Sequence, residues 1–589
     1  MKREELLVTT AIEETWELEN SNKILFLGEN CKIYDRKKTL YELDYSTLND
    51  PWSDRENRKK EYIRLEKLYE FFLKHLTNVL NHHHQINESS SYWRILIGPW
   101  LKVFLNSVYH QWKMLENLHK SDWRGRTLVI KNLDDTKISS DMEDFYQSRL
   151  SDAWNHHLCS SIIQEIFDDI SIDFIEVPAL IKFEPLLDLT KSPSEKILDL
   201  FRNFINKISI TVNGKSSNFF HKTYLTRRHQ SLLYLKMRTL PYFTVEKFNI
   251  DKAIYNKISR LNLLKKFRLE HDGQFENFFY NKILEYIPIN YFEGFDDSKK
   301  FLKSQKWPES PKSIVTANSH WVDEIFKLYA AEKVSTGSKL KLIVHGGHGK
   351  AEYSDFEKHE IDISDKIFSW GWLEYSDKII KGFYIKDLIK PNKIKPENTF
   401  LHIMFSEWRY VLLLKSSPSY QQVVDQHMDD QLMFLSNLRD DIRQKAIIKP
   451  MDKVNFHEEI FSKKFTDLTF VYREIDFNTL IQTSKVVIHS YNETTIVETL
   501  ANNIPTIAYW NHEHWEQCPS SIEIYKMLSS CGIVHSSAAE AAAHLNLIWD
   551  DVDSWWQGDK VREAVSLHNN WYARKTDHPI KELVEFIDS

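Results

Sequence analysis

Short apolar runs that end at polar turns recur along the chain, and longer stretches mix charged and apolar residues at helical spacing. Up to residue 310 the pattern predicts, in order, strands at 6–10 and 24–28, a helix at 54–80, a helix from Tyr92, a strand at 126–130 and mostly helix from residue 140. This first half therefore combines a few buried strands with a long helical region.

From residue 313 strands and helices alternate. The expected strands are 314–318, 341–345, 366–369, 399–405, 468–473, 485–490, 506–510 and 533–535, and the expected helices are 321–331, 419–439, 476–484, a helix from 494, and 579–588. Such alternation predicts parallel sheets with helices on both faces, the α/β class. We place a linker at 390–398 between an N-terminal α/β domain (1–390, with a helical insertion at about 54–310) and a C-terminal α/β domain (391–589).

Composition narrows the classes of protein. The net charge of −7 gives no support for nucleic-acid binding. The four cysteines form no CxxC pair, so neither a zinc knuckle nor a redox motif is indicated, and their scarcity fits a reducing cytoplasm. No signal-peptide core and no apolar run of about 20 residues is seen, so we expect a cytoplasmic protein with at most peripheral contact at the inner face of the membrane.

The strand–turn–helix pattern at 486–507 is the first candidate site. Hydroxyl and amide side chains follow the strand where the helix begins, and with the helix N-terminus they can hold a phosphate: Ser490, Asn492, Thr494 and Thr495. Glu498, one turn further on, can grip ribose hydroxyls. No GxGxxG or P-loop motif lies in this third of the chain. The alternative is an ordinary helix cap with solvated side chains.

His345 marks the second candidate site, at the carboxyl end of an apolar strand. Gly346 and Gly347 allow a tight turn and the close approach of a ligand. The imidazole can act as a general base on an acceptor hydroxyl or bind a phosphate. His348 is a lesser candidate for the same tasks, and the alternative is a structural turn.

These motifs resemble known families. The 486–507 pattern is similar to the nucleotide-binding half of GT-B glycosyltransferases. Several segments together resemble the bacterial LIC12162-type transferases of surface-polysaccharide gene clusters: 6–16, 24–31, 92–100, the His345 turn, 369–372 and 492–500. The chain departs from the His-Gly-Gly-x-x-Gly turn that we expect there, because it has a histidine at 348 and a glycine at 349. The resemblance implies a GT-B-like fold, with two Rossmann-like domains facing a cleft, and sugar transfer.

The resemblance also implies candidate site residues in the first domain. The loop after the first strand lies at the cleft in GT-B enzymes, so Glu13 or Glu14 can deprotonate the acceptor, and Thr9 and Thr10 can contact a substrate; an acid-rich helix start is the alternative.

Four further positions are candidates. Glu357, Glu360 or Asp362 can serve as a base or orient His345, but solvated acids on a helix are the interpretation that the sequence favours. Arg409 follows the strand ending at Phe405 and can clamp a diphosphate.

Two tryptophans, Trp370 and Trp372, can stack on a sugar, or lie in the core. Neither His512 with His514 nor His82 to His84 has convincing metal-ligand spacing, so no metal site is predicted.

The prediction is therefore a metal-independent glycosyltransferase that builds a cell-surface glycan such as lipopolysaccharide or capsule. The second domain binds a nucleotide-sugar co-substrate, for which a CMP-linked acidic sugar is one candidate. The first domain binds a glycan or lipid-linked glycan acceptor, and no separate cofactor is expected. Two alternatives stay open: a polyol-phosphate transferase with a CDP-linked donor, and a non-catalytic scaffold of polysaccharide assembly.

Overall fold

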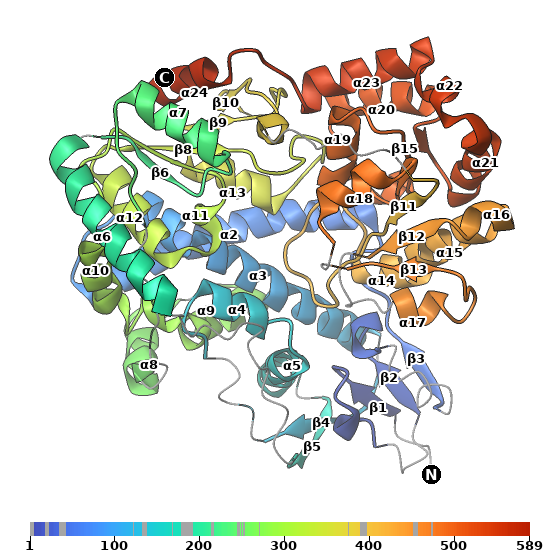
Figure 1. Cartoon of the computed structure of the whole chain (residues 1–589). Helices are drawn as coiled ribbons and strands as arrows, with labels where there is room; N and C mark the ends of the chain where they lie inside the picture. Colours follow the sequence, from blue (N-terminus) through green and yellow to red (C-terminus); the bar gives the residue numbers. More distant parts are fainter. Residues whose placement is uncertain are drawn as a thin grey trace. The chain divides into compact units, whose positions relative to one another are not determined.

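The computed structural model in Figure 1 describes the chain as two compact units. It covers every residue except 1–4, 18–22, 34–42, 122, 132, 134–137, 168, 178–192, 214–216, 244–247, 249, 251–253, 270, 375, 389–396, 451–456 and 473–474. The first unit comprises residues 1–222, 239–340 and 409–414, and the second unit comprises 223–238, 341–408 and 415–589. The short segment 409–414 thus belongs to the first unit although the residues around it belong to the second, and the segment 223–238 belongs to the second unit although the residues around it belong to the first.

The first unit contains a five-stranded parallel sheet in the order β3-β2-β1-β4-β5. The strands are β1 (Glu5–Val8), β2 (Ile24–Phe26), β3 (Tyr45–Thr47), β4 (Gly125–Ile130) and β5 (Ser171–Ile175). Numbered along the chain this order is 3-2-1-4-5, as in Rossmann-like folds, where the order reverses between the first and fourth strands. The carboxyl ends of β1 and β4 therefore flank the switch point of this sheet.

Two long helices, α2 (Arg55–His84) and α3 (Ser90–Lys120), form the core of the first unit and pack against each other. Each begins at a capping side chain: Asp54 accepts from the backbone N–H of Asn57, and Ser89 accepts from that of Tyr92. Helix α3 is buried on most sides, and its buried residues include polar ones such as Lys102, Asn106 and Gln111 beside the apolar majority.

The rest of the first unit is mostly helical, as predicted for residues 140–310. Its further elements are α4 (Met142–Ser148), α5 (Asp152–Ile166), α6 (Pro193–Asn213), β6 (Phe219–His221), α8 (Lys257–Lys266), α9 (Gln274–Tyr286), α10 (Phe295–Ser304), β7 (Ser313–Thr316), α11 (Ser319–Val322) and α12 (Glu324–Ser335). Strands β6 and β7 pair in parallel. The stretch 54–310, expected as a helical insertion, therefore also supplies β4, β5 and β6.

The second unit contains a six-stranded parallel sheet in the order β13-β12-β11-β14-β15-β16. The strands are β11 (Phe400–Ile403), β12 (Ala446–Lys449), β13 (Thr469–Phe470), β14 (Val486–His489), β15 (Thr506–Tyr509) and β16 (Val534–His535). The order is 3-2-1-4-5-6 along the chain, with its switch point between β11 and β14. Strand β12 is the one that the sequence pattern did not reveal.

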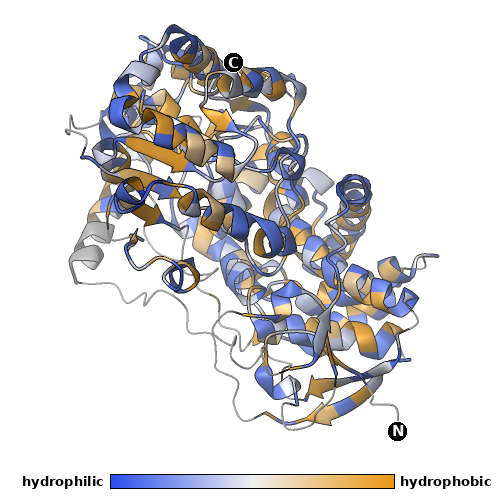
Figure 2. Cartoon of the chain, turned by 90° about the vertical axis from the view of Figure 1, so that its right-hand side faces the viewer, coloured by the Kyte–Doolittle hydropathy of each residue, from blue (hydrophilic) through white to orange (hydrophobic). Residues whose placement is uncertain are grey.

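Helices cover both faces of this sheet, as the strand pattern predicted. Alternate residues of a strand point to opposite faces. Phe400 of β11 lies in a core cluster with Phe434 of α15 (Met428–Ser436), whereas Leu401 lies in another cluster with Leu480 of α18 (Phe477–Thr483). In Figure 2 the strands are mostly orange and the helices mix orange with blue, which is the colouring expected of doubly covered strands and helices with one apolar face. The α/β class with two Rossmann-like sheets is confirmed.

The second unit contains further strands and helices. Strands β8 (Lys339–Ile343), β9 (Lys366–Phe368) and β10 (Ile379–Ile380) pair in parallel through β9, and β8 crosses into this unit at Lys341. The helices are α7 (Arg227–Met237), α13 (Asp355–Ile363), α14 (Tyr420–Gln422), α16 (Asp440–Arg443), α17 (His457–Phe461), α19 (Thr494–Ala501), α20 (Pro519–Ser530), α21 (Ala538–Ile548), α22 (Val552–Trp556), α23 (Asp559–Tyr572) and α24 (Pro579–Asp588).

The structure differs from the sequence pattern in one predicted helix of the second unit. The helix expected at 419–439 is interrupted by a π-helical segment, Val423–His427, between α14 and α15. The predicted linker at 390–398 lies largely outside the described residues. Within the described parts of the chain, no helix is long and apolar enough to cross a membrane.

Candidate functional site

A pocket of about 460 Å³ lies in the second unit, where the loop after β8 meets the N-terminus of α19. This volume is within the usual range for sites of small ligands, about 300–1,000 Å³. The lining comes from six stretches of chain: Tyr224; His345, Gly346, Gly347, His348, Lys350, Ala351, Ser354, Phe356 and Glu357; Lys386; Lys415 and Ser416; Asn492, Glu493 and Thr494; Trp515, Glu516 and Gln517. Both candidate motifs of the sequence, the His345 turn and the 490–495 turn, thus meet at one pocket.

The glycine turn rests directly on the start of α19. The backbone N–H of Gly347 donates to Thr494 Oγ1 at 3.0 Å. A Cβ atom on Gly347 would lie 3.0 Å from Thr494 Cα, and one on Gly346 would lie 3.2 Å from Thr494 Oγ1. Glycine is therefore needed here for the close approach of two backbones, as the sequence predicted for this turn.

His345 lies between two other aromatic rings at the pocket. Its ring is nearly parallel to that of Tyr224, with centroids 5.7 Å apart and an interplanar angle of 12°. The ring of His348 meets it edge to face at 5.6 Å. The stacking holds the imidazole at the pocket wall, where it can meet a ligand.

His348 is held close to two carboxylates. Its Nε2 lies 3.7 Å from Glu360 Oε2. Burial lowers the pKa of this imidazole, but the carboxylates of Glu360 and Glu357 outweigh burial, so the pKa lies above 6.5. Burial in turn raises the pKa of Glu357, whose Oε2 accepts from the backbone N–H of Gly349 at 3.2 Å. Glu360, named as a candidate base, orients His348 rather than His345.

A buried lysine lies beneath the glycine turn. Lys350 is 4% exposed, and its Nζ donates to the backbone oxygen of Glu493 at 3.0 Å. Burial lowers the pKa of this ammonium to about 8, although Glu493 and Glu357 oppose the change. At neutral pH the group is mostly protonated, so it adds positive charge beside the N-terminus of α19, where the helix dipole already favours anions.

Glu493 occupies the N-cap position of α19 and is compensated by lysines. Burial raises its pKa, but Lys415 and Lys350 outweigh burial and hold the pKa below 4.5. Lys415 Nζ lies 3.4 Å from Glu493 Oε1. The carboxylate is therefore ionised at neutral pH, and it partly neutralises the two ammonium groups.

Backbone hydrogen bonds join the loops of the pocket wall. Glu352 N–H donates to Glu516 O at 2.9 Å, and Cys518 N–H donates to Lys350 O at 2.9 Å. On the other side, Ser416 N–H donates to Tyr353 O at 3.1 Å. The segment after the glycine turn is thus held between two neighbouring loops, which preorganises the pocket.

Only two of the predicted donor-binding side chains of this turn line the described pocket, Asn492 and Thr494. Ser490 is fully buried, and its Oγ accepts from the backbone N–H of Phe405 at 2.9 Å across the switch point. Thr495 Oγ1 lies 3.1 Å from His489 Nδ1 and donates to Tyr491 OH at 3.0 Å. These two hydroxyls join strand ends and helix inside the second unit.

Glu498 forms an ion pair with Lys386. Its carboxylate is nearly buried, while Lys386 reaches the pocket lining. Glu498 therefore acts on the pocket through Lys386 in this arrangement.

The candidate residues of the first unit gather at the carboxyl end of β1. Arg409, on the segment 409–414, donates to Asn30 O at 3.0 Å and lies 2.6 Å from Asp152 Oδ2. Asp152 also accepts from Ala11 N–H at 3.0 Å. Burial raises the pKa of Asp152, but the Arg409 guanidinium outweighs burial and holds it below 3.8. Arg409, expected to clamp a phosphate in the second domain, is placed in the first unit.

The threonines after β1 are buried beside this ion pair. Thr9 Oγ1 lies 3.1 Å from His156 Nδ1, and the backbone oxygen of Thr10 accepts from the indole N–H of Trp16 at 3.3 Å. Glu13 and Glu14 follow in a short 3₁₀ helix, Glu13–Thr15, with Glu14 exposed and Glu13 half-buried.

The two tryptophans after β9 are core residues. Trp370 Nε1 donates to Val344 O at 2.8 Å, behind the His345 turn. Trp372 packs under Gly349, whose φ is +80° and where a Cβ would lie 2.5 Å from the indole. Both indole rings pack against the His345 turn, so neither is placed to stack on a sugar.

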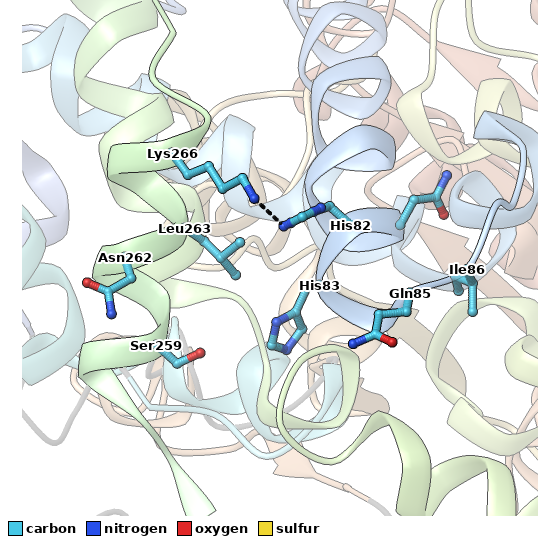
Figure 3. Close-up of a pocket in the computed structure, with 9 residues that line it drawn as sticks. His82, His83, Gln85, Ile86, Ser259, Asn262, Leu263 and Lys266 are labelled. Atoms are coloured by element: carbon cyan, nitrogen blue, oxygen red, sulfur yellow. Dashed lines mark hydrogen bonds between the residues drawn. The ribbon is translucent and has the colours of Figure 1, made fainter.

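A second cavity, of about 730 Å³, lies in the first unit between the end of α2 and α8 (Figure 3). Lys266 Nζ donates to His82 Nε2 at 2.8 Å across it. The three consecutive histidines diverge: His83 stacks on Phe292 with centroids 3.8 Å apart, and His84 Nε2 lies 3.0 Å from Tyr291 O. Among the described residues no group of three or more His, Cys, Asp or Glu could hold a metal ion.

The residues of the pocket that sequence reasoning missed include Lys350, Glu493, Lys415 and Tyr224. Lys350 could have been found, because it directly follows the glycine turn. Glu493 lies within the predicted turn itself, so the sequence could have revealed it as well. Neither Lys415 nor Tyr224 has a local signal, since each arrives from a distant part of the chain.

Comparison with known proteins places the chain in a family. The model of the LIC12162 family transferases matches residues 5–587, so the chain belongs to this family and is a transferase. A search of curated proteins finds no match.

Similar solved structures include MnaA from S. aureus with UDP (11% identity, 64% of this chain and 96% of that chain, TM-score 0.37). Others are HepE from Anabaena with UDP and glucose (11%, 64% and 100%, 0.35) and a glycosyltransferase from Rickettsia africae (12%, 64% and 98%, 0.34).

Proposed function

We propose that this transferase moves a sugar from a nucleotide-activated donor onto a cell-surface glycan, with the donor phosphates bound in the pocket of the second unit. The observation that carries the proposal is the meeting of the Gly346–Gly347 turn, the N-terminus of α19 and the buried ammonium of Lys350 at one pocket. Backbone N–H groups, a helix N-terminus and a fixed cation are the features that bind phosphate.

The chemistry follows from this placement. The acceptor hydroxyl oxygen attacks the anomeric carbon, the bond from that carbon to the donor phosphate breaks, and the hydroxyl proton passes to a base. His345 lies at the pocket wall and takes the role of base. The helix dipole and Lys350 stabilise the charge that develops on the leaving phosphate, and this route requires no metal.

The acceptor belongs to the first unit in this proposal, near Thr10 and Glu13 at the carboxyl end of β1. The Rossmann-like strand orders of both sheets support a GT-B-like fold. A CMP-linked acidic sugar is one candidate donor, and peripheral contact with the inner face of the membrane is part of the same proposal.

A thermal-shift screen against CMP, CDP, UDP, dTDP and GDP, with and without Mg²⁺, tests the proposal. A ligand at about 100 times its Kd stabilises a protein by about 2.7 kcal/mol, which raises Tm measurably. A CMP, UDP, dTDP or GDP shift supports the sugar transferase, and a shift with CDP alone favours transfer of a polyol phosphate. No shift with any nucleotide would instead support a non-catalytic scaffold.

A matched pair of variants localises the site. Thr494→Val removes the hydroxyl that contacts the glycine turn at the pocket and should lower nucleotide affinity. Thr479→Val, on α18 away from the described pocket, should leave affinity unchanged. Equal affinities in both variants would place nucleotide binding elsewhere.

A further inference from the structure

Tyr224 is an outlier in the wall of the pocket. Its φ is +61°, in the left-handed region that residues other than glycine seldom adopt, and its side chain is 52% exposed. Neither burial nor backbone preference therefore explains a tyrosine at this position. Strained backbone of this kind clusters at active sites and ligand-binding sites, where the surrounding structure holds it in place.

The neighbours of Tyr224 anchor it without its own ring. Thr223 and Leu225, on either side, are buried. The helix that follows, α7, packs against α24 within the second unit, and Figure 1 shows the two side by side. The segment 223–238 is thus docked by other residues, and the Tyr224 ring remains at the pocket, stacked on His345.

The position of this ring relative to the phosphate-binding turn indicates which part of a ligand it meets. His345 directly precedes Gly346, which approaches Thr494 at the start of α19. A group stacked beside His345 is therefore close to the phosphates. In a nucleotide sugar the transferred sugar is bonded directly to the phosphate, whereas the base is separated from it by the ribose.

We propose that Tyr224 contacts the sugar ring of the donor and selects donors by that ring. This inference rests on the proposed function and deepens it. An aromatic face packs against the apolar face of a pyranose, and the phenol hydroxyl can bond to sugar hydroxyls. A segment from the first half of the sequence thus completes the pocket of the second unit.

Tyr224→Gly tests the proposal, because glycine adopts the observed φ without strain and the buried neighbours stay in place. Calorimetric titrations compare UDP-glucose, dTDP-glucose, GDP-mannose and CMP-sialic acid, each with its bare nucleotide. The expected result is about tenfold weaker binding of the sugar conjugate, the size of one lost aromatic contact, with less than a twofold change for the bare nucleotide. Tm should equal or exceed that of the wild type.

The matched control is Arg238→Gly. Arg238 is also left-handed, with φ +53°, and it caps the far end of α7 in the same segment. Its replacement should raise or preserve Tm and leave all affinities unchanged.

Three results would overturn the inference: unchanged affinity for the sugar conjugates, an equal loss for conjugate and bare nucleotide, or a Tm several degrees lower in Tyr224→Gly with binding intact. Failure of the wild type to bind any of these probes would instead refute the proposed function, and the inference with it.

Discussion

Replacing Lys350 by methionine separates the two effects of a buried ammonium, on stability and on ligand binding. The lysine stem is enclosed by the pocket wall, and its Nζ donates to Glu493 O. Methionine keeps a similar unbranched shape but removes the charge and the hydrogen bond. The variant therefore leaves the packing nearly intact and changes the electrostatics.

The magnitude follows from the pKa. Burial lowers the pKa of Lys350 from 10.5 to about 8, and at about 1.4 kcal/mol for each factor of ten this corresponds to about 3 kcal/mol of destabilisation at neutral pH. Losing the hydrogen bond to Glu493 O costs about 1–3 kcal/mol if that oxygen stays buried. We therefore expect Lys350→Met to be as stable as the wild type at pH 7, or more stable by up to about 2 kcal/mol.

The pH dependence has a definite sign. The unfolded chain keeps the Lys350 proton up to about pH 10.5, while the folded protein releases it near 8. The unfolded state thus binds more protons between these values, and the free energy of unfolding of the wild type rises with pH there. Relative to Lys350→Met, the wild type should gain stability from pH 8 to 10.5, in urea titrations of both proteins.

Ligand binding should change in the opposite direction. A lost charge-assisted hydrogen bond is worth about 1.5–3 kcal/mol, so nucleotide affinity should fall about 10- to 100-fold at pH 7. Wild-type affinity should also weaken above pH 8, where Lys350 loses its proton. Lys526→Met, at an exposed lysine of α20, serves as the control and should change neither property. A variant destabilised by more than about 2 kcal/mol with full nucleotide affinity would refute the reasoning.

Three further outcomes are expected. Gly347→Ala should destabilise the protein by about 1–3 kcal/mol and lower nucleotide affinity, because the new Cβ would lie 3.0 Å from Thr494 Cα; an unchanged Tm would show that the turn can shift. Asp152→Asn should lower the free energy of unfolding by about 2 kcal/mol at pH 7, because it weakens the pair with Arg409. In urea titrations this difference from the wild type should vanish as the pH falls below 3.8 and through the pKa of Asp152 in the folded protein. A difference that persists at such low pH would show that the charge of Asp152 is not its cause. His345→Ala should cut turnover about 100-fold or more while sparing donor binding, and full activity would remove it from the chemistry.

The local pattern of the sequence was enough to predict the class of fold and the two ends of the site. The apolar run 486–489 followed by polar residues and a helix is a strand–turn–helix unit wherever it folds, because burial of alternating strand faces and the caps of a helix are local requirements. Gly346 and Gly347 likewise predicted a close approach of the backbone, and their contact with Thr494 confirms it.

Tertiary structure decided which side chains reach the pocket. Thr494 and Thr495 are chemically identical, but successive residues of a helix point about 100° apart, so Thr494 lines the pocket while the hydroxyl of Thr495 contacts His489 and Tyr491. Ser490 Oγ accepts from the backbone N–H of Phe405 across the switch point and therefore does not reach the pocket. This hydrogen bond depends on the order of the strands in the sheet.

The distant contributions were beyond any local pattern. Tyr224 joins the second unit and Arg409 the first, each on a segment exchanged between the two stretches of sequence. The hydrophobic pattern of a segment predicts that one face is buried. It does not predict which other segment covers that face, because the hydrophobic effect is non-directional. The sequence by itself therefore determined the elements and the turns, while long-range packing determined which charges and rings share the pocket.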